Sequence, residues 1–346
     1  MLVGLLAAPA GPETPGPRWL AYATRGKTSA ICLRNLVTGK ENTVRRVERP
    51  GQGFDCLQWT ADGSRLVFFS RPDIDSTEVV SFDPATGRQT VTRLGPEMEG
   101  VECSGSIIDP AGRYLAVVDR GGPALRVIRL GRGEQVLERA LPGECCEDDG
   151  GGLVWLPGKA DGLMVWCREQ VRIIGLKGEQ RVLRTESPIR SILGWVPGRR
   201  RYLVARADGS GAPAFFDPRT AGLEPIAAPA GFWARYTVRA IDRAGRVLVL
   251  EQGTDEKTRF LTWRIGSTRP EPWFAMRYTE IPTLAPRVHS GTVALVVKGS
   301  TFLMPGGDIH VARVGERLGQ AVARARRPSL RETVTCHSPV LRPAGP

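Results

Sequence analysis

The sequence predicts an all-β fold made of repeated four-stranded units, and three observations lead to this prediction. Short apolar, strand-like runs recur at a nearly constant spacing along the 346 residues. Turn signals built from Asp, Pro and Gly stand at fixed positions between these runs. No stretch shows the capped, 3.6-residue apolar period of a helical repeat. The composition agrees, because 41 Gly and 27 Pro are typical of a turn-rich globular chain.

Seven units are defined by apolar runs that each follow a turn. These runs stand about 45 residues apart, a period that indicates a repeat architecture. They cover residues 19–24, 66–70, 114–118, 163–167, 202–205, 247–251 and 293–297.

Two kinds of turn mark each unit. The first precedes the apolar run and contains Asp and Gly, as in residues 60–65, 109–113 and 242–246. Asp accepts hydrogen bonds from the turn backbone and Gly adopts positive φ, so this turn predicts a β-hairpin. The second turn lies further along, in residues 34–40, 82–88 and 216–222. Two turns imply four short strands, which in the second unit we expect at 57–60, 65–70, 77–82 and 88–94.

Four-stranded antiparallel units of this length, repeated six to eight times, are the blades of a β-propeller. Residues 57–69 read Leu-Gln-Trp-Thr-Ala-Asp-Gly-Ser-Arg-Leu-Val-Phe-Phe. They resemble the blade motif of the TolB-like or WD40-like (PD40-type) β-propeller family, in which an apolar residue, an Asp-Gly turn and an apolar strand follow one another. The resemblance covers residues 17–325. It implies a fold and leaves the activity open.

The predicted organisation is a single propeller domain over residues 17–325, with seven blades, or six as the alternative. The first unit lacks room for an inner strand. Either residues 2–8 supply that strand, or residues 333–341 return from the basic C-terminal tail, residues 326–346, to close the ring. Closure in either way would leave no exposed sheet edge.

Three tryptophans stand at equivalent positions near the ends of the predicted inner strands. Large aromatic side chains dominate cores of this kind, so we expect all three to pack between blades. They are Trp59, Trp155 and Trp195.

The N-terminal residues 1–16 are interpreted as a truncated signal peptide remnant with a Pro-rich lead-in, or else as the first inner strand. The apolar stretch ends at Ala8-Pro9-Ala10, which resembles a cleavage box, but no basic segment precedes it. We therefore expect a periplasmic or secreted protein, with a cytoplasmic location as the alternative. No apolar run approaches the roughly 18 residues that a transmembrane helix needs.

Charge is unevenly distributed along the chain. The formal net charge is +12, but the basic residues are mostly single, scattered arginines, so nucleic-acid binding is not expected. Acidic residues gather instead in the connections that lead into the third and fourth units. Such connections converge on the channel of a propeller and would attract a basic partner or a cation. The candidate partner-binding residues are Glu97, Glu99, Glu102, Glu144, Glu147, Asp148 and Asp149.

Cysteines and carboxylates in these connections allow two further interpretations. The cysteine spacing matches no zinc signature, and in an exported protein one or two disulfides would form among Cys56, Cys103, Cys145 and Cys146. Carboxylate oxygens are the ligands that Ca²⁺ prefers. Candidate ligands of Ca²⁺ or another divalent cation are Glu102, Glu147, Asp148 and Asp149, although no cofactor is required by any motif.

The predicted function is a non-enzymatic protein–protein interaction module that binds a protein or peptide partner through the channel mouth and the acidic inter-blade loops. The family resemblance implies an exported bacterial scaffold. The alternative is a propeller enzyme, a hydrolase or lyase, in which a divalent cation at the channel mouth activates water. No catalytic residue is assigned, because no nucleophile, base and orienting group stand in a recognised pattern.

Overall fold

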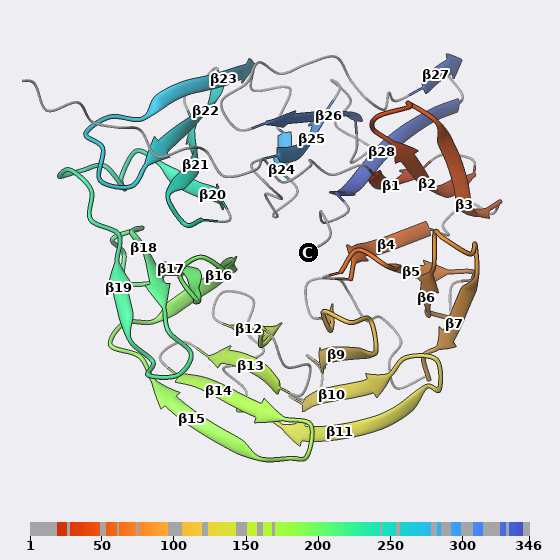
Figure 1. Cartoon of the computed structure of the whole chain (residues 1–346), viewed down its shortest axis with the longest axis horizontal. Coiled ribbons are helices and arrows are strands. Elements are labelled where there is room, and N and C mark those ends of the chain that lie inside the picture. The colour runs from red at the N-terminus through yellow and green to blue at the C-terminus, as the bar shows by residue number, and fades with distance from the viewer. Residues whose placement is uncertain are drawn as a thin grey trace, which may run out of the picture.

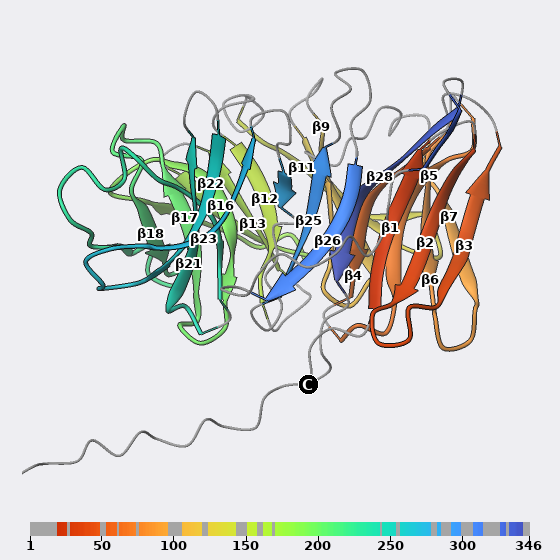
Figure 2. The same ribbon diagram turned by 90° about the horizontal axis from the view of Figure 1, so that it is seen from above.

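The computed structural model of the chain describes residues 19–25, 28–48, 53–60, 62–73, 76–95, 106–119, 124–142, 151–157, 162–167, 170–242, 244–253, 257–277, 282–284, 292–298, 307–313, 326–329 and 332–341. Within these ranges all regular secondary structure is β-strand. The strands are arranged as blades around a central axis (Figure 1). In the perpendicular view they run between the two faces of a disc, and the turns lie on these faces (Figure 2). No helix that could span a membrane occurs in the described ranges.

Five sheets have four strands each, paired in sequence order. Their strands are β4 (Gly53–Trp59), β5 (Leu66–Arg71), β6 (Glu78–Phe82) and β7 (Gln89–Arg93); β8 (Ser106–Ile108), β9 (Tyr114–Asp119), β10 (Ala124–Arg129) and β11 (Glu134–Ala140); β12 (Gly151–Trp155), β13 (Gly162–Cys167), β14 (Gln170–Gly175) and β15 (Gln180–Arg184); β16 (Ile189–Val196), β17 (Arg201–Arg206), β18 (Pro213–Phe216) and β19 (Leu223–Pro225); β20 (Thr237–Ile241), β21 (Val247–Gly253), β22 (Lys257–Arg264) and β23 (Glu271–Arg277).

The sixth sheet joins the two ends of the chain and has eight strands. Its order is β24-β25-β26-β28-β1-β2-β3, with β27 paired to β28. These strands are β1 (Trp19–Arg25), β2 (Ser29–Asn35), β3 (Glu41–Val47), β24 (Pro282–Leu284), β25 (Thr292–Lys298), β26 (Gly307–Arg313), β27 (Arg326–Ser329) and β28 (Glu332–Leu341).

The described strands therefore form six sheets. The predicted number of seven separate blades is wrong, and the alternative of six is confirmed. The physical reason lies in β28, which pairs with β1 along most of its length and also with β26 at Gly307 and Cys336. This double pairing merges the first and last sequence units into one sheet. It also closes the ring through the C-terminal strand, which was one of the two arrangements expected for the first unit.

The repeat predicted from the sequence is confirmed by the strands. Each of the seven apolar runs corresponds to one strand, and the first residue of the run lies within one position of the first residue of that strand. The strands are β1, β5, β9, β13, β17, β21 and β25. In the second unit all four expected strands are present, as β4 to β7.

The Asp-Gly turns have the geometry that their sequence predicts. Asp109 Oδ1 accepts a hydrogen bond from the backbone N–H of Tyr114 at 2.7 Å, and Asp242 Oδ1 accepts one from Val247 at 2.8 Å. Gly112 and Gly245 each have φ of 70° in these turns. The carboxylate thus satisfies the backbone donors while glycine takes the left-handed conformation that other residues adopt at a cost.

The second turn is equally regular but contains one departure from glycine. Gly39 and Gly87 have φ of 71° and 73°, each donating its N–H to the carbonyl of the Asn or Asp four residues earlier. Ala221 occupies the corresponding place in the β18–β19 turn, with φ of 62° and the same bond to Asp217. The hydrogen-bond pattern therefore sets the turn conformation even where a methyl group stands in place of hydrogen.

The core consists of layers between neighbouring blades, as the strand β5 illustrates. Phe68 packs with Ile31 toward the β1–β3 strands, whereas the adjacent Phe69 packs with Leu115 toward the β8–β11 blade. Successive side chains on a strand point to opposite faces, and each face of this blade meets another blade. The middle strands are accordingly apolar on both faces, while outer strands such as β7 are mostly exposed.

Candidate functional site

The acidic cluster predicted from the sequence lies outside the described residues. This applies to all seven partner-binding and metal candidates and to Cys103, Cys145 and Cys146. Their role remains a prediction. Within the ranges that the structure describes, no group of three or more His, Cys, Asp or Glu side chains is placed to hold a metal ion.

Two cysteines in the inner part of the ring each take part in a disulfide bond. They are Cys56, on β4, and Cys167, at the end of β13. Cys56 belongs to the predicted disulfide set, whereas Cys167 does not, because it stands in an apolar run with no acidic residue directly beside it. Cys32 is buried and takes part in no disulfide.

An open groove of about 610 Å³ lies between the β12–β15 and β16–β19 blades. It is bounded by the ends of β12 and β16 and by the β18–β19 turn. The lining combines six apolar residues with three arginines. The apolar residues are Leu156, Pro157, Ile173, Trp195, Pro197 and Pro218, and the arginines are Arg181, Arg200 and Arg219. Apolar walls with a few charged groups are typical of sites that bind ligands or peptides.

Trp195 lies on the wall of this groove, and its exposure distinguishes it from its two counterparts. Trp59 and Trp155 are 4% and 5% exposed, whereas Trp195 is only half-buried. The ring of Trp195 packs edge-on against that of Tyr202, with the ring centroids 4.9 Å apart. The Tyr202 hydroxyl in turn donates to the Trp155 carbonyl at 2.9 Å. The expectation that all three tryptophans pack between blades therefore holds fully for two of them.

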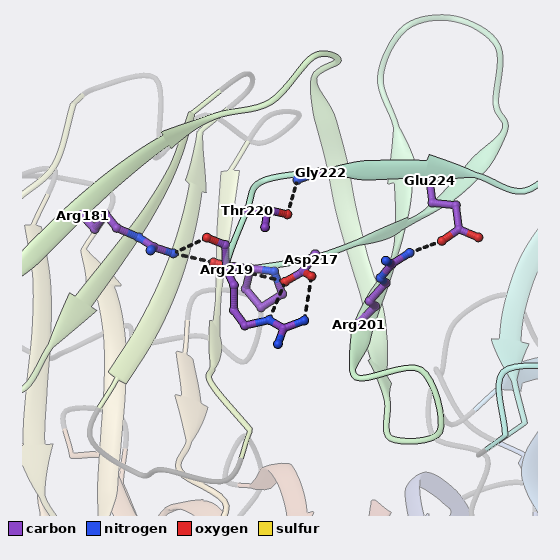
Figure 3. A network of polar contacts seen from close by, with 8 residues as sticks. Arg181, Arg201, Asp217, Arg219, Thr220, Gly222 and Glu224 are labelled. Atoms are coloured by element: carbon purple, nitrogen blue, oxygen red, sulfur yellow. Dashed lines mark hydrogen bonds and ion pairs between the residues drawn. The ribbon is translucent and has the colours of Figure 1, made fainter.

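Arg181 joins the two blades at the outer end of the groove. Its Nη2 donates to the carbonyl oxygens of Pro218 at 2.8 Å and Arg219 at 3.1 Å, as Figure 3 shows. A comparable contact joins the β8–β11 and β12–β15 blades, where Arg139 on β11 donates to the Gly178 carbonyl in the β14–β15 turn. Arg181 is thus held in place by neutral acceptors and keeps its positive charge at the rim.

Replacing Arg181 by Met is expected to lower the free energy of unfolding by about 1 kcal/mol, because two charge-assisted hydrogen bonds are lost at an exposed site. Urea unfolding followed by circular dichroism would measure the change. Arg184→Met is the matched control, since Arg184 is exposed on the same strand and its side chain makes no polar contact among the described residues. Equal losses in both variants would show that the contact between blades contributes nothing.

Arg219 is paired with Asp217 in the β18–β19 turn. Its Nε and Nη2 donate to the two carboxylate oxygens at 3.1 and 3.0 Å (Figure 3). These hydrogen bonds hold the pKa of Asp217 below its ordinary value, against the opposing effect of burial. The carboxylate is therefore ionised at neutral pH, and its contribution to stability is lost only as the pH falls through this lowered pKa.

Arg200 differs from the other two arginines of the groove. It lies in the β16–β17 turn, is exposed, and has no hydrogen bond or ion pair of its side chain within the described part of the chain. Its backbone has φ of 53°, which is uncommon for a residue other than glycine. The neighbouring Arg201 is instead paired with Glu224 (Figure 3). Arg200 therefore presents an unpaired guanidinium group at the mouth of the groove.

The groove was not predicted from the sequence. Trp195 lies near the end of β16 and Arg200 in the turn that follows, whereas Arg219 lies in the β18–β19 turn, and no motif relates all three. The single signal is the run of three arginines Arg199-Arg200-Arg201 after Pro197-Gly198, a basic turn that stands where other units have an Asp-Gly turn.

Comparison with known proteins establishes the fold alone. The sequence matches no protein-family model and no curated protein. The β-propeller domain of the Trilobed protease from Pyrococcus furiosus is similar, with a TM-score of 0.59 and 12% identity, covering 91% of this chain and 97% of that one. The C-terminal WD40 domain of Sif2 has a TM-score of 0.54 and 11% identity, covering 95% and 94%.

TolB from Acinetobacter baumannii is also similar, with a TM-score of 0.51 and 12% identity, covering 96% of this chain and 68% of that one. The predicted resemblance to TolB-like and WD40-like propellers is thereby confirmed at the level of fold. Propellers serve many unrelated functions, so the function must be argued from the site.

Proposed function

We propose that the chain is a non-enzymatic interaction module that binds a protein partner through loops and turns of its ring. The observation that carries the proposal is the groove between the β12–β15 and β16–β19 blades, with its apolar walls and arginine rim. Trp and Arg are the residue types that contribute most to protein–protein binding. A rigid ring that holds such a groove open needs little ordering when it binds, which favours affinity.

A second binding region is the acidic set predicted from the sequence, from Glu97 to Asp149. In the proposed function these carboxylates attract a basic segment of the partner, while the groove takes an acidic or apolar one. Two regions of opposite charge would fix the orientation of the partner and exclude partners with the wrong charge pattern.

The location proposed for this module is an oxidising compartment, the periplasm or the exterior of the cell. The disulfide-bonded state of Cys56 and Cys167 supports it, because disulfides persist in such compartments and are rare in the cytosol.

The experiment that tests the proposed function is partner capture in the source organism, with the tagged chain crosslinked in cells and the captured proteins quantified. We expect one partner in near-stoichiometric amount. Its recovery should fall when Glu144, Glu147, Asp148 and Asp149 are changed together to their amides, and should persist in an Arg132→Ala control, which removes an exposed arginine from the β10–β11 turn.

Two outcomes would contradict this function. Capture that is unchanged by the amide substitutions would exclude the acidic region, and absence of any stoichiometric partner would exclude the module itself. Native mass spectrometry of the purified chain provides an independent check. A stoichiometric divalent ion that is lost in a Glu102→Gln variant would favour a hydrolase or lyase instead.

A further inference from the structure

We infer that the groove between the β12–β15 and β16–β19 blades binds an acidic peptide segment, and that Arg200 recognises its carboxylate. The inference rests on the proposed function, because the segment would belong to the protein partner. It adds the chemical class of the ligand and the residue that selects it.

The size and lining of the groove suit an organic ligand better than a bare inorganic anion. A volume of about 610 Å³ lies within the usual range for sites that enclose organic ligands. Six of the nine lining residues are apolar, and such walls stabilise only a ligand that has apolar groups to bury. One aliphatic or aromatic side chain against Trp195 and Pro197 would use this surface.

The charge of the groove selects an anionic ligand. Among the described residues, the lining has three guanidinium groups and no carboxylate, and Asp217 is paired with one of these groups. Arg219 is committed to Asp217, and the Nη2 of Arg181 is directed at two carbonyl oxygens. Of the three arginines, only Arg200 makes no side-chain hydrogen bond or ion pair in the part of the chain that the structure describes. A guanidinium group binds a carboxylate through two parallel hydrogen bonds, which gives it both affinity and geometric selectivity.

The backbone conformation of Arg200 also distinguishes it from the residues at the same place in other blades. In three other hairpin turns next to the inner strands, the positive φ belongs to glycine, at Gly63, Gly112 and Gly245. In the β16–β17 turn it belongs to Arg200, where a left-handed conformation costs stability that glycine would not lose. The turn therefore keeps an arginine side chain beside the groove although glycine would fit its backbone better.

The test uses octapeptides selected from a random phage-displayed library on the intact chain. The selected peptide is synthesised with a fluorescein label, together with a matched peptide in which Asp and Glu are replaced by Asn and Gln. Fluorescence anisotropy then gives the Kd of each. We expect the selected peptides to contain Asp or Glu beside an apolar residue, and the amide peptide to bind at least about tenfold more weakly.

Substitution of Arg200 separates binding from folding. Arg200→Gly is expected to weaken the acidic peptide about tenfold and, because glycine relieves the positive φ, to raise the Tm by about 2 °C. Arg200→Lys keeps the charge without the paired donors and should give an intermediate Kd. Arg132→Ala, the control at a distant turn, should change neither quantity.

Three results would overturn the inference. They are selected peptides without acidic residues, an unchanged Kd in Arg200→Gly, and a single-stranded oligonucleotide that competes as well as the unlabelled peptide. These results leave the proposed function intact if the tagged chain still captures its partner in cells and loses it on neutralisation of the acidic connections. Failure of that capture would instead remove the proposed function, whatever the peptides do.

Discussion

Deletion of β28 is expected to abolish the cooperative thermal unfolding of the chain. Leu20 and Ala21 of β1 are fully buried, and their register partners on β28 are Leu341 and Val340. Without β28 the edge of β1 loses its hydrogen-bond partners and becomes open to other chains. Each lost hydrogen bond contributes about 1 kcal/mol, and burial is lost as well, so the total approaches the 5–15 kcal/mol by which domains are stable.

Differential scanning calorimetry would measure this loss, with a chain that ends directly after Leu341 as the control. A synthetic peptide with the sequence of β28, added in trans, should restore the transition by supplying the missing strand. A truncated chain that unfolds cooperatively at the original Tm without the peptide would show that the ring closes in another way.

Replacement of Gly245 by Ala is expected to cost about 3 kcal/mol of unfolding free energy, from two causes that add. An added Cβ would lie 2.7 Å from Val196 Cγ1 and 3.0 Å from Arg199 Cδ. Val196 is fully buried, so this contact is relieved only by moving the packed core between the two blades. In addition φ is 70°, a conformation that costs an alanine about 1 kcal/mol or more.

Gly231→Ala separates the two causes. Gly231 has φ of 69° and no atom within 4 Å of an added Cβ, so only the backbone cost of about 1 kcal/mol applies. Urea unfolding of both variants would give the difference. Equal losses would mean that the Asp-Gly turn of the β20–β23 blade is not packed tightly against the β16–β19 blade.

The blade pattern was predictable because it rests on local chemistry repeated along the chain. The turn around Gly112, for example, needs only one Asp, one Gly and two apolar flanks to specify a hairpin. The number of sheets was not predictable in the same way. It depends on β28, which pairs with β26 nearby in the sequence and also with β1, more than 300 positions away.

The groove, by contrast, could not be predicted from local sequence patterns. Trp195 belongs to the same pattern as Trp59 and Trp155, and the pattern alone predicts the same burial for all three. In the folded chain β16 has two register shifts against β17, whereas β4 and β20 each have one against their neighbours, and the sequence pattern does not reveal this difference. Arg200 likewise has no motif, since its value as a binding group depends on the absence of a partner, and that is a property of the folded ring.

The most direct test of the whole account is hydrogen–deuterium exchange of the chain with and without its captured partner. If the partner binds at the groove and at the acidic connections, we expect its binding to slow exchange in both regions. At the groove the slower segments are the β16–β17 and β18–β19 turns. Exchange in the exposed outer strands β3, β7 and β11 should be unchanged. Protection confined to those outer strands, with the groove turns unaffected, would contradict the account.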